Sequence, residues 1–159
     1  MFRFLLPVSV TLVLATTTGL FAHSGAKGIV LERMEAMTTI GKSMVAISKM
    51  MRGSKSVNAS ELEDHASLIE IHARKMTTDY FPAGSIGKLS AAKDSIWQDW
   101  EAFSAVATTL KDSAFQMQTH ATKLAQNGIT PEGKDFVSLF TSMKRTCASC
   151  HDAFRSNKD

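Results

Sequence analysis

The stretch Cys147-Ala148-Ser149-Cys150-His151, close to the C-terminal end of the chain, determines most of what the sequence predicts. It has the pattern C-x-x-C-H, which is typical of covalent attachment of a c-type haem. In this chemistry each thiol adds to one vinyl group of the porphyrin, and the histidine that follows binds the iron. The sequence contains no further cysteine. We therefore expect Cys147 and Cys150 to hold one haem c and His151 to be its proximal ligand.

Two other uses of a C-x-x-C pair stay open at this point. A structural or redox-active disulfide has the same spacing, and half of a zinc site can be built on it. Redox motifs of the thioredoxin kind lie near a βαβ pattern, and zinc sites need more cysteines or a paired histidine. The sequence shows neither feature, so haem attachment is the favoured interpretation.

The N-terminal residues 1–22 have the composition of a secretory signal peptide. Arg3 precedes an uncharged apolar run, and a cut after Ala22 fits the pattern. A retained membrane anchor is the alternative, but the run is short for a membrane span and contains Pro7. Export agrees with the haem motif, because bacteria attach haem to thiols outside the cytoplasm. We expect removal of the signal peptide and one domain, residues 23–159, located in the periplasm and not bound to the membrane.

The charge pattern limits the classes of partner. The formal net charge is +3 at pH 7 and falls to +2 once Arg3 leaves with the signal peptide. Basic and acidic residues are interspersed along the chain, so the sequence does not indicate a nucleic-acid-binding surface. Exposed basic residues can steer docking to periplasmic redox partner proteins, although a mixed solvated surface is the simpler interpretation.

The first half of the mature chain predicts two amphipathic helices, because apolar residues recur with a helical period. The first covers residues 26–52, with an expected buried row at Val30, Met34, Met37, Gly41, Met44, Ser48 and Met51 and with Ile40 and Ile47 beside that row. A capping box of Ser60 and Glu63 opens the second helix, which extends to residue 78. Its expected buried row is Leu62, Ala66, Ile69, Ala73 and Met76.

After a Pro- and Gly-containing loop at 79–87, the second half predicts two more helices. The third covers residues 92–127, with an expected buried row at Trp100, Phe103, Ala107, Leu110, Ala114, Met117, Ala121 and Leu124. Thr130 and Pro131 open the fourth. Its inward face is expected to carry Phe136, Leu139, Phe140, Met143, Cys147, Cys150 and Phe154. The predicted fold is all-α: an antiparallel four-helix bundle with haem bound near the C-terminal end of the fourth helix.

Three stretches together resemble the class II c-type cytochromes, which are cytochrome c′ and its low-spin relatives. They are Cys147–Arg155, Glu32–Met37 in the first helix and Ile96–Trp100 at the start of the third. Class I cytochromes place the haem motif near the N-terminus, so its C-terminal position favours class II. Ala148 departs from the basic residue that often follows the first cysteine in this family. The resemblance implies a four-helix bundle with covalently bound haem.

The resemblance also implies roles for three residues outside the motif. Arg33 is similar to the arginine that pairs with a haem propionate, and a guanidinium group suits a carboxylate. Arg155 is similar to the arginine that closes off the proximal imidazole of His151. Met37 occupies the distal position, where cytochrome c′ has a bulky side chain that leaves iron five-coordinate and the low-spin relatives have a ligating methionine. A surface position for the arginines and a packing role for Met37 are the alternatives.

Two functions follow from the distal position. With His151 and Met37 as iron ligands, the protein is a periplasmic one-electron carrier; with five-coordinate iron, it binds nitric oxide or carbon monoxide. We expect no enzymatic activity, because the sequence offers neither paired carboxylates nor a nucleophile with its base.

Four histidines are possible alternative ligands of the iron but are expected at the surface or rim: His23, His65, His72 and His120. The resemblance implies a homodimer, because family members commonly pair through their first two helices, and Ile29, Ile40 and Ile47 flank the core row of the first helix as an apolar strip. The alternative is a monomer that uses these isoleucines in its own core.

Overall fold

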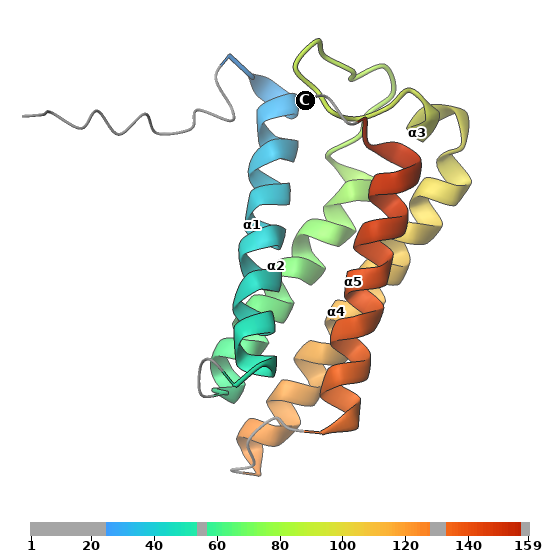
Figure 1. The fold of residues 1–159 in the computed structure, drawn as a ribbon. Coiled ribbons are helices and arrows are strands. Elements are labelled where there is room, and N and C mark those ends of the chain that lie inside the picture. The colour runs from blue at the N-terminus through green and yellow to red at the C-terminus, as the bar shows by residue number, and fades with distance from the viewer. Residues whose placement is uncertain (1–24, 54–56, 128–132, 157–159) are drawn as a thin grey trace, which may run out of the picture.

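The computed structural model describes residues 25–53, 57–127 and 133–156. Four long helices lie side by side, and successive long helices run in opposite directions (Figure 1). The elements are α1 (Gly28–Met51), α2 (Ala59–Thr78), α3 (Ser95–Gln98), α4 (Trp100–Gln126) and α5 (Lys134–Phe154). Within the described ranges, the only bridge of the β type is an isolated one between Ala92 and Arg155. The predicted all-α antiparallel four-helix bundle is confirmed.

Two predicted features lie outside the described residues. These are the signal peptide at 1–22, with its cut after Ala22, and the helix start at Thr130 and Pro131. The described start of α5 has Gly133 as its N-cap, with φ 102°, a conformation that favours glycine. None of the described helices is both long enough and apolar enough to cross a membrane.

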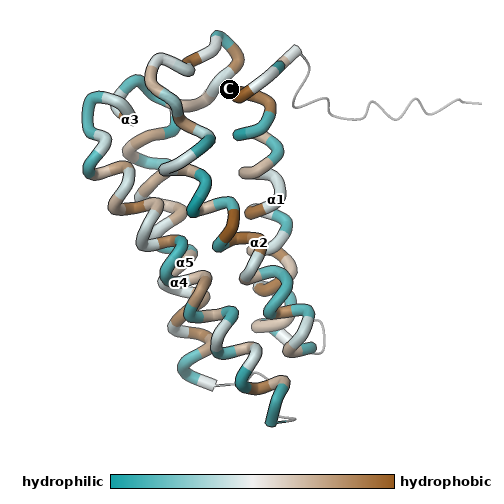
Figure 2. The backbone as a smooth tube through the Cα atoms, turned by 180° about the vertical axis from the view of Figure 1, so that it is seen from behind, coloured by the Kyte–Doolittle hydropathy of each residue, from teal (hydrophilic) through white to brown (hydrophobic). Residues whose placement is uncertain are grey.

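The core between α2 and α4 is closely packed. The buried residues of α2 are those that the sequence predicts: Leu62, Ala66, Ile69, Ala73 and Met76. Those of α4 include most of the predicted row: Phe103, Ala107, Leu110, Ala114, Met117 and Ala121. Alanines on both helices let the two backbones approach closely. Hydropathy alternates along each long helix, as expected for amphipathic helices in a bundle (Figure 2).

The predicted third helix is interrupted at Asp99. This residue has φ −133° and ψ 63°, and its side chain accepts a hydrogen bond from the backbone amide of Ala102 at 3.1 Å. Asp99 therefore caps α4 and separates it from the short α3. Trp100 begins α4 and is 38% exposed, and Leu124 is only half-buried, so the two ends of the predicted row lie outside the core.

The predicted buried row of α1 is wrong by one residue position. The residues that α1 buries are Arg33, Ala36, Ile40, Ser43, Ile47 and Met50. The predicted row, which includes Met34, Met37 and Met44, is half-buried or exposed. The helix has two apolar faces, and the stronger periodic signal belongs to the half-buried face rather than to the buried one.

The same finding corrects the predicted dimer strip. Ile40 and Ile47 are 5% and 0% exposed, so both belong to the core of the protomer itself. Ile29 is partly buried and packs against that core. The three isoleucines therefore offer no apolar strip to a second copy.

The predicted capping box of α2 is also wrong. Asn58 is the N-cap, and its side-chain oxygen accepts hydrogen bonds from the amides of Ser60 at 2.9 Å and Glu61 at 3.3 Å. The helix therefore begins one residue before Ser60, at Ala59. An asparagine N-cap serves the same purpose as a serine, because it satisfies amides that have no partner inside the helix.

Candidate haem site

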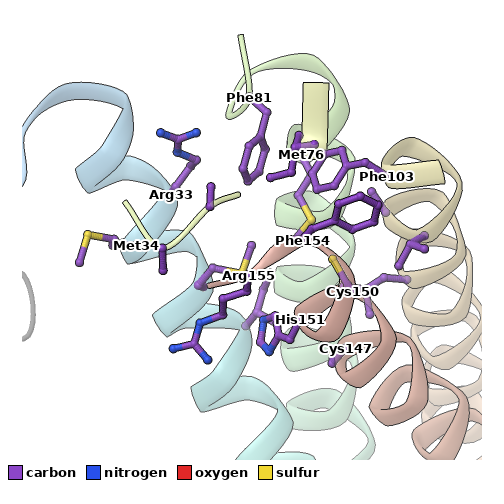
Figure 3. A pocket seen from close by; sticks show the side chains of 18 of the residues that line it. Arg33, Met34, Met76, Phe81, Phe103, Cys147, Cys150, His151, Phe154 and Arg155 are labelled. Carbon is purple, nitrogen blue, oxygen red and sulfur yellow. The ribbon is translucent and has the colours of Figure 1, made fainter. Parts of the chain in front are cut away.

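A cavity of about 660 Å³ brings together all six residues that the sequence singles out. Small-molecule and cofactor sites typically measure about 300–1,000 Å³. The cavity is lined from α1 and from α5, with further walls from α4 and from the loop before α3 (Figure 3). The six residues on its wall are Arg33, Met37, Cys147, Cys150, His151 and Arg155.

The last turns of α5 supply the haem-attachment motif. Cys147, Cys150 and His151 lie three and four positions apart, which places them on one face of the helix. Both cysteines are free and half-buried. Burial raises the pKa of the Cys147 thiol, and burial with the neighbouring Cys147 raises the pKa of Cys150 to about 11. Redox-active thiols have lowered pKa values, so the structure does not favour the dithiol-exchange alternative.

The zinc alternative has no support either. In the part of the chain that the structure describes, no group of three or more His, Cys, Asp or Glu residues is arranged to hold a metal ion. Both cysteines line the cavity.

His151 stands at the edge of this cavity (Figure 3). Partial desolvation lowers the pKa of its imidazole, the charge of Arg155 lowers it further, and Asp152 opposes the effect. A neutral imidazole is the form that binds a metal. Arg155 is exposed and also lines the cavity. The position of His151 beside the two thiols fits an axial ligand of an attached haem.

Arg33 is the clearest sign that the cavity suits an anionic group. The side chain is 4% exposed, and its guanidinium carbon lies 4.9 Å from the ring centroid of Phe81. Nη1 donates to the hydroxyl of Ser85 at 3.3 Å, and Nη2 donates to the Ser85 carbonyl. Its Nε is buried without a hydrogen-bond partner. A buried donor without a partner is costly, and burial lowers the pKa of this guanidinium.

The charges around the cavity also favour an anionic group. Its described wall contains three cationic side chains, Arg33, Lys144 and Arg155, and no carboxylate. The remaining lining is mainly apolar. A flat apolar group that carries carboxylates, as haem does, fits this distribution of charge.

Methionines line the side of the cavity formed by α1. Met37 lies on this wall together with Met34 and Met44. In Figure 3 the Met34 side chain points away from the other labelled residues, whereas Met76 of α2 extends toward Phe154. Met76 is 4% exposed and also lines the cavity. The periodicity of α2 identifies Met76 as a core residue, but this pattern does not indicate that the end of α2 borders the cavity.

The alternative histidine ligands that the structure describes lie away from the cavity. His65 Nδ1 is 3.3 Å from the Ser43 hydroxyl, and His72 Nδ1 is 2.8 Å from the Tyr80 hydroxyl. Neither these two nor His120 lines the cavity. His23 lies outside the described residues. Sequence reasoning missed the loop residues on the wall, such as Phe81 and residues 89–92, because an irregular loop has no periodicity to reveal its contacts.

Comparisons with known proteins identify the family of the chain. The family described as Cytochrome C′ matches residues 28–155. The chain is 32% identical over 136 residues to cytochrome c-556 of Agrobacterium fabrum, with 84% of each chain covered. Among solved structures, cytochrome c prime from Shewanella frigidimarina has a TM-score of 0.69 at 21% identity, covering 81% of this chain and 94% of that one. A nitric oxide complex of a cytochrome c prime mutant from Alcaligenes xylosoxidans has a TM-score of 0.68 at 18% identity, covering 82% and 94%.

A four-helix bundle with C-x-x-C-H near the end of its last helix, beside a cavity with a cationic and apolar lining, defines a class II c-type cytochrome. The chain belongs to the cytochrome c′ family. Its cofactor is a covalently attached haem c.

Proposed function

We propose that the protein is a periplasmic one-electron carrier in which His151 is the proximal ligand of the haem iron and Met37 the distal ligand. The observation that carries this proposal is the shared cavity: α5 presents the thiols and the imidazole to it, and α1 presents Met37 to the same cavity. The haem supplies the one-electron chemistry. Methionine as the sixth ligand favours ferrous iron and so raises the reduction potential.

The remaining site residues bind and orient the cofactor. Cys147 and Cys150 form the thioether links and fix the haem along α5. Arg33 pairs with a propionate, since its buried Nε has no partner among the described residues. Arg155 covers the proximal side, four residues after His151. The proposal assigns no catalytic reaction to these residues.

The alternative is a five-coordinate protein that binds nitric oxide or carbon monoxide on the distal side. This alternative is supported by the structural relative from Alcaligenes xylosoxidans, a cytochrome c prime mutant of similar fold that was solved as a nitric oxide complex. Met37 then packs near the iron without binding it. The two functions differ in one contact, the bond between the Met37 sulfur and the iron. Because this bond sets the spin state of the iron, absorption spectroscopy separates them.

The decisive experiment is the absorption spectrum of the purified protein in both oxidation states. For the carrier, we expect low-spin iron in both states, a weak ferric charge-transfer band from sulfur and slow binding of carbon monoxide. Met37→Ala is then expected to become high-spin, to bind carbon monoxide readily and to have a lower reduction potential. High-spin ferric iron in the wild type, or an unchanged spectrum of Met37→Ala, would overturn ligation by Met37.

Met34→Ala is the matched control. Met34 lies one turn before Met37 on α1, lines the same cavity and is also half-buried, but its side chain points away from the other labelled residues in Figure 3. Its truncation is expected to leave the spin state unchanged. A loss of stability does not discriminate, because truncating a half-buried methionine removes packing contacts whether or not its sulfur binds iron.

The proposed location and partners follow from the same function. A periplasmic carrier exchanges electrons with other periplasmic redox proteins, and cell fractionation tests the location. A homodimer stays a prediction. Because Ile40 and Ile47 are buried, the exposed large apolar residues that the described parts of the first two helices offer to a partner are Val45 of α1 and Leu68 of α2. Sedimentation that shows only the monomer mass at micromolar concentration would contradict it.

A further inference from the structure

The last turn of α5 is held from outside the helix. The final four carbonyls of an α-helix have no partner within the helix. In α5, which ends at Phe154, the first of these carbonyls belongs to His151 and accepts from the amide of Arg155 at 3.1 Å. The other three, those of residues 152–154, accept hydrogen bonds from a distant segment. That segment therefore completes the turn that carries His151.

Lys93 satisfies all three of these carbonyls. Its Nζ donates to the carbonyls of Asp152 at 2.9 Å and Ala153 at 3.2 Å, and its backbone amide donates to that of Phe154 at 2.9 Å. The hydroxyl of Ser95 adds a bond to the Ala153 carbonyl at 3.3 Å. A lysine ammonium at a helix C-terminus also opposes the negative end of the helix dipole.

The backbone on either side strengthens this contact. Ala92 and Arg155 form the isolated bridge, and the amide of Ser156 donates to the carbonyl of Ala91 at 2.7 Å. We call residues 91–95 the clasp. Ala91 and Ala92 themselves line the cavity, so the clasp contacts both the haem site and the helix end that carries its anchors.

We propose that Lys93 is a positioning residue that fixes the turn of His151 and raises the reduction potential of the haem. The inference rests on the proposed role of His151 as the proximal ligand, but not on ligation by Met37. Reduction removes one positive charge from the iron centre. A cation that offsets the negative end of α5 therefore disfavours ferric iron and stabilises ferrous iron.

The test compares four variants of the holoprotein by potentiometric titration and by electron paramagnetic resonance of the ferric form. Lys93→Arg keeps the charge and the donors, Lys93→Gln keeps a donor without charge, and Lys93→Met keeps neither. Lys134→Met is the control. It removes an equal charge from the exposed first turn of α5, 17 residues and therefore about 26 Å of helix before His151, where salt screens its effect.

We expect the ferrous-to-ferric ratio at fixed potential to fall several-fold, up to about tenfold or 59 mV, in Lys93→Met. The ferric g values of this variant are expected to shift, because they report the orientation of the axial ligand. Lys93→Arg should keep both the wild-type potential and the wild-type g values. Lys93→Gln should keep the g values better than the potential, and Lys134→Met should match the wild type in both. An unchanged potential in Lys93→Met, or an equal fall in Lys93→Arg or Lys134→Met, would overturn the proposal.

These outcomes are separate from those that test the proposed function. Failure of Met37 ligation is visible in the wild-type spin state, before any variant of Lys93 is made. Failure of the proposed role of Lys93 leaves the wild-type spectrum as expected and appears only when the potentials of the four variants are compared.

Discussion

The two halves of the bundle are built differently. Between α2 and α4 the protein fills its own interior with residues that are completely buried, such as Leu62, Ala73, Ala114 and Met117. α1 packs mainly on α2 and α5 mainly on α4 (Figure 1). Between α1 and α5 lies a cavity of about 660 Å³ with a mainly apolar wall. One half is thus closed by side chains, and the other is shaped for a cofactor that the chain attaches covalently.

This difference explains where sequence reasoning succeeded. The apolar residues of α2 and of most of α4 form one stripe on each helix, so their buried rows followed from periodicity, although Met76, Phe103 and Leu110 in these rows also line the cavity. α1 instead has two stripes, one in the core and one on the cavity wall. In α1 the methionine row was therefore assigned to the core, whereas it lines the cavity, and Ile40 and Ile47 occupy the core instead.

The largest effect is expected from the half that needs the cofactor. Replacing Cys147 and Cys150 by Ser removes both thioether links, and the apolar cavity wall is then left in contact with water. We expect a largely unfolded product, because burial of this wall by haem supplies a large part of the stability of a marginally stable domain. Circular dichroism and thermal unfolding measure the result. A haem-free double mutant with full helicity and a cooperative transition would show that the closed half suffices.

Leu62→Ala is expected to have the next largest effect and tests the closed half directly. Leu62 is 0% exposed in the core of α2, so its truncation leaves a cavity and lowers the free energy of unfolding by about 2–5 kcal/mol. The haem spectrum should not change. Met44→Ala, on the half-buried wall of α1, should cost less stability in chemical denaturation. An equal cost for the two substitutions would contradict the contrast between the halves.

Arg33 links the two halves, because it belongs to the buried row of α1 and also lines the cavity. In the holoprotein, Arg33→Met is expected to lower stability by about 1.5–3 kcal/mol, the usual worth of a hydrogen bond to a charged group. Arg33→Lys keeps the charge without the planar donors and should lose less stability than Arg33→Met. Ser85→Ala removes only the acceptor of Nη1 and serves as the control. A more stable Arg33→Met protein would mean that Arg33 is a buried cation without an anionic partner.

The site residues, like the helices, divide into those that the sequence alone predicts and those that it does not. The anchors and His151 were predictable because their chemistry is encoded in five adjacent residues. Met37 and Arg33 required a resemblance, since spacing along one helix does not reveal which face meets a cavity. Lys93 had no signal in the sequence. Its role depends on hydrogen bonds to residues about 60 positions away, which form only when the loop before α3 reaches the end of α5.

The smallest expected effect distinguishes the observed N-cap of α2 from the predicted one. Asn58 accepts hydrogen bonds from the amides of Ser60 and Glu61, so Asn58→Ala leaves helix donors without this partner and should cost about 1 kcal/mol, or roughly 2–4 °C in melting temperature. Ser60→Ala should cost clearly less, because the Ser60 side chain does not cap the helix. Both residues lie at the start of the same helix, so thermal unfolding of the two holoproteins gives a matched comparison. A larger loss for Ser60→Ala would restore the capping box of Ser60 and Glu63 and would move the start of α2 to where the sequence placed it.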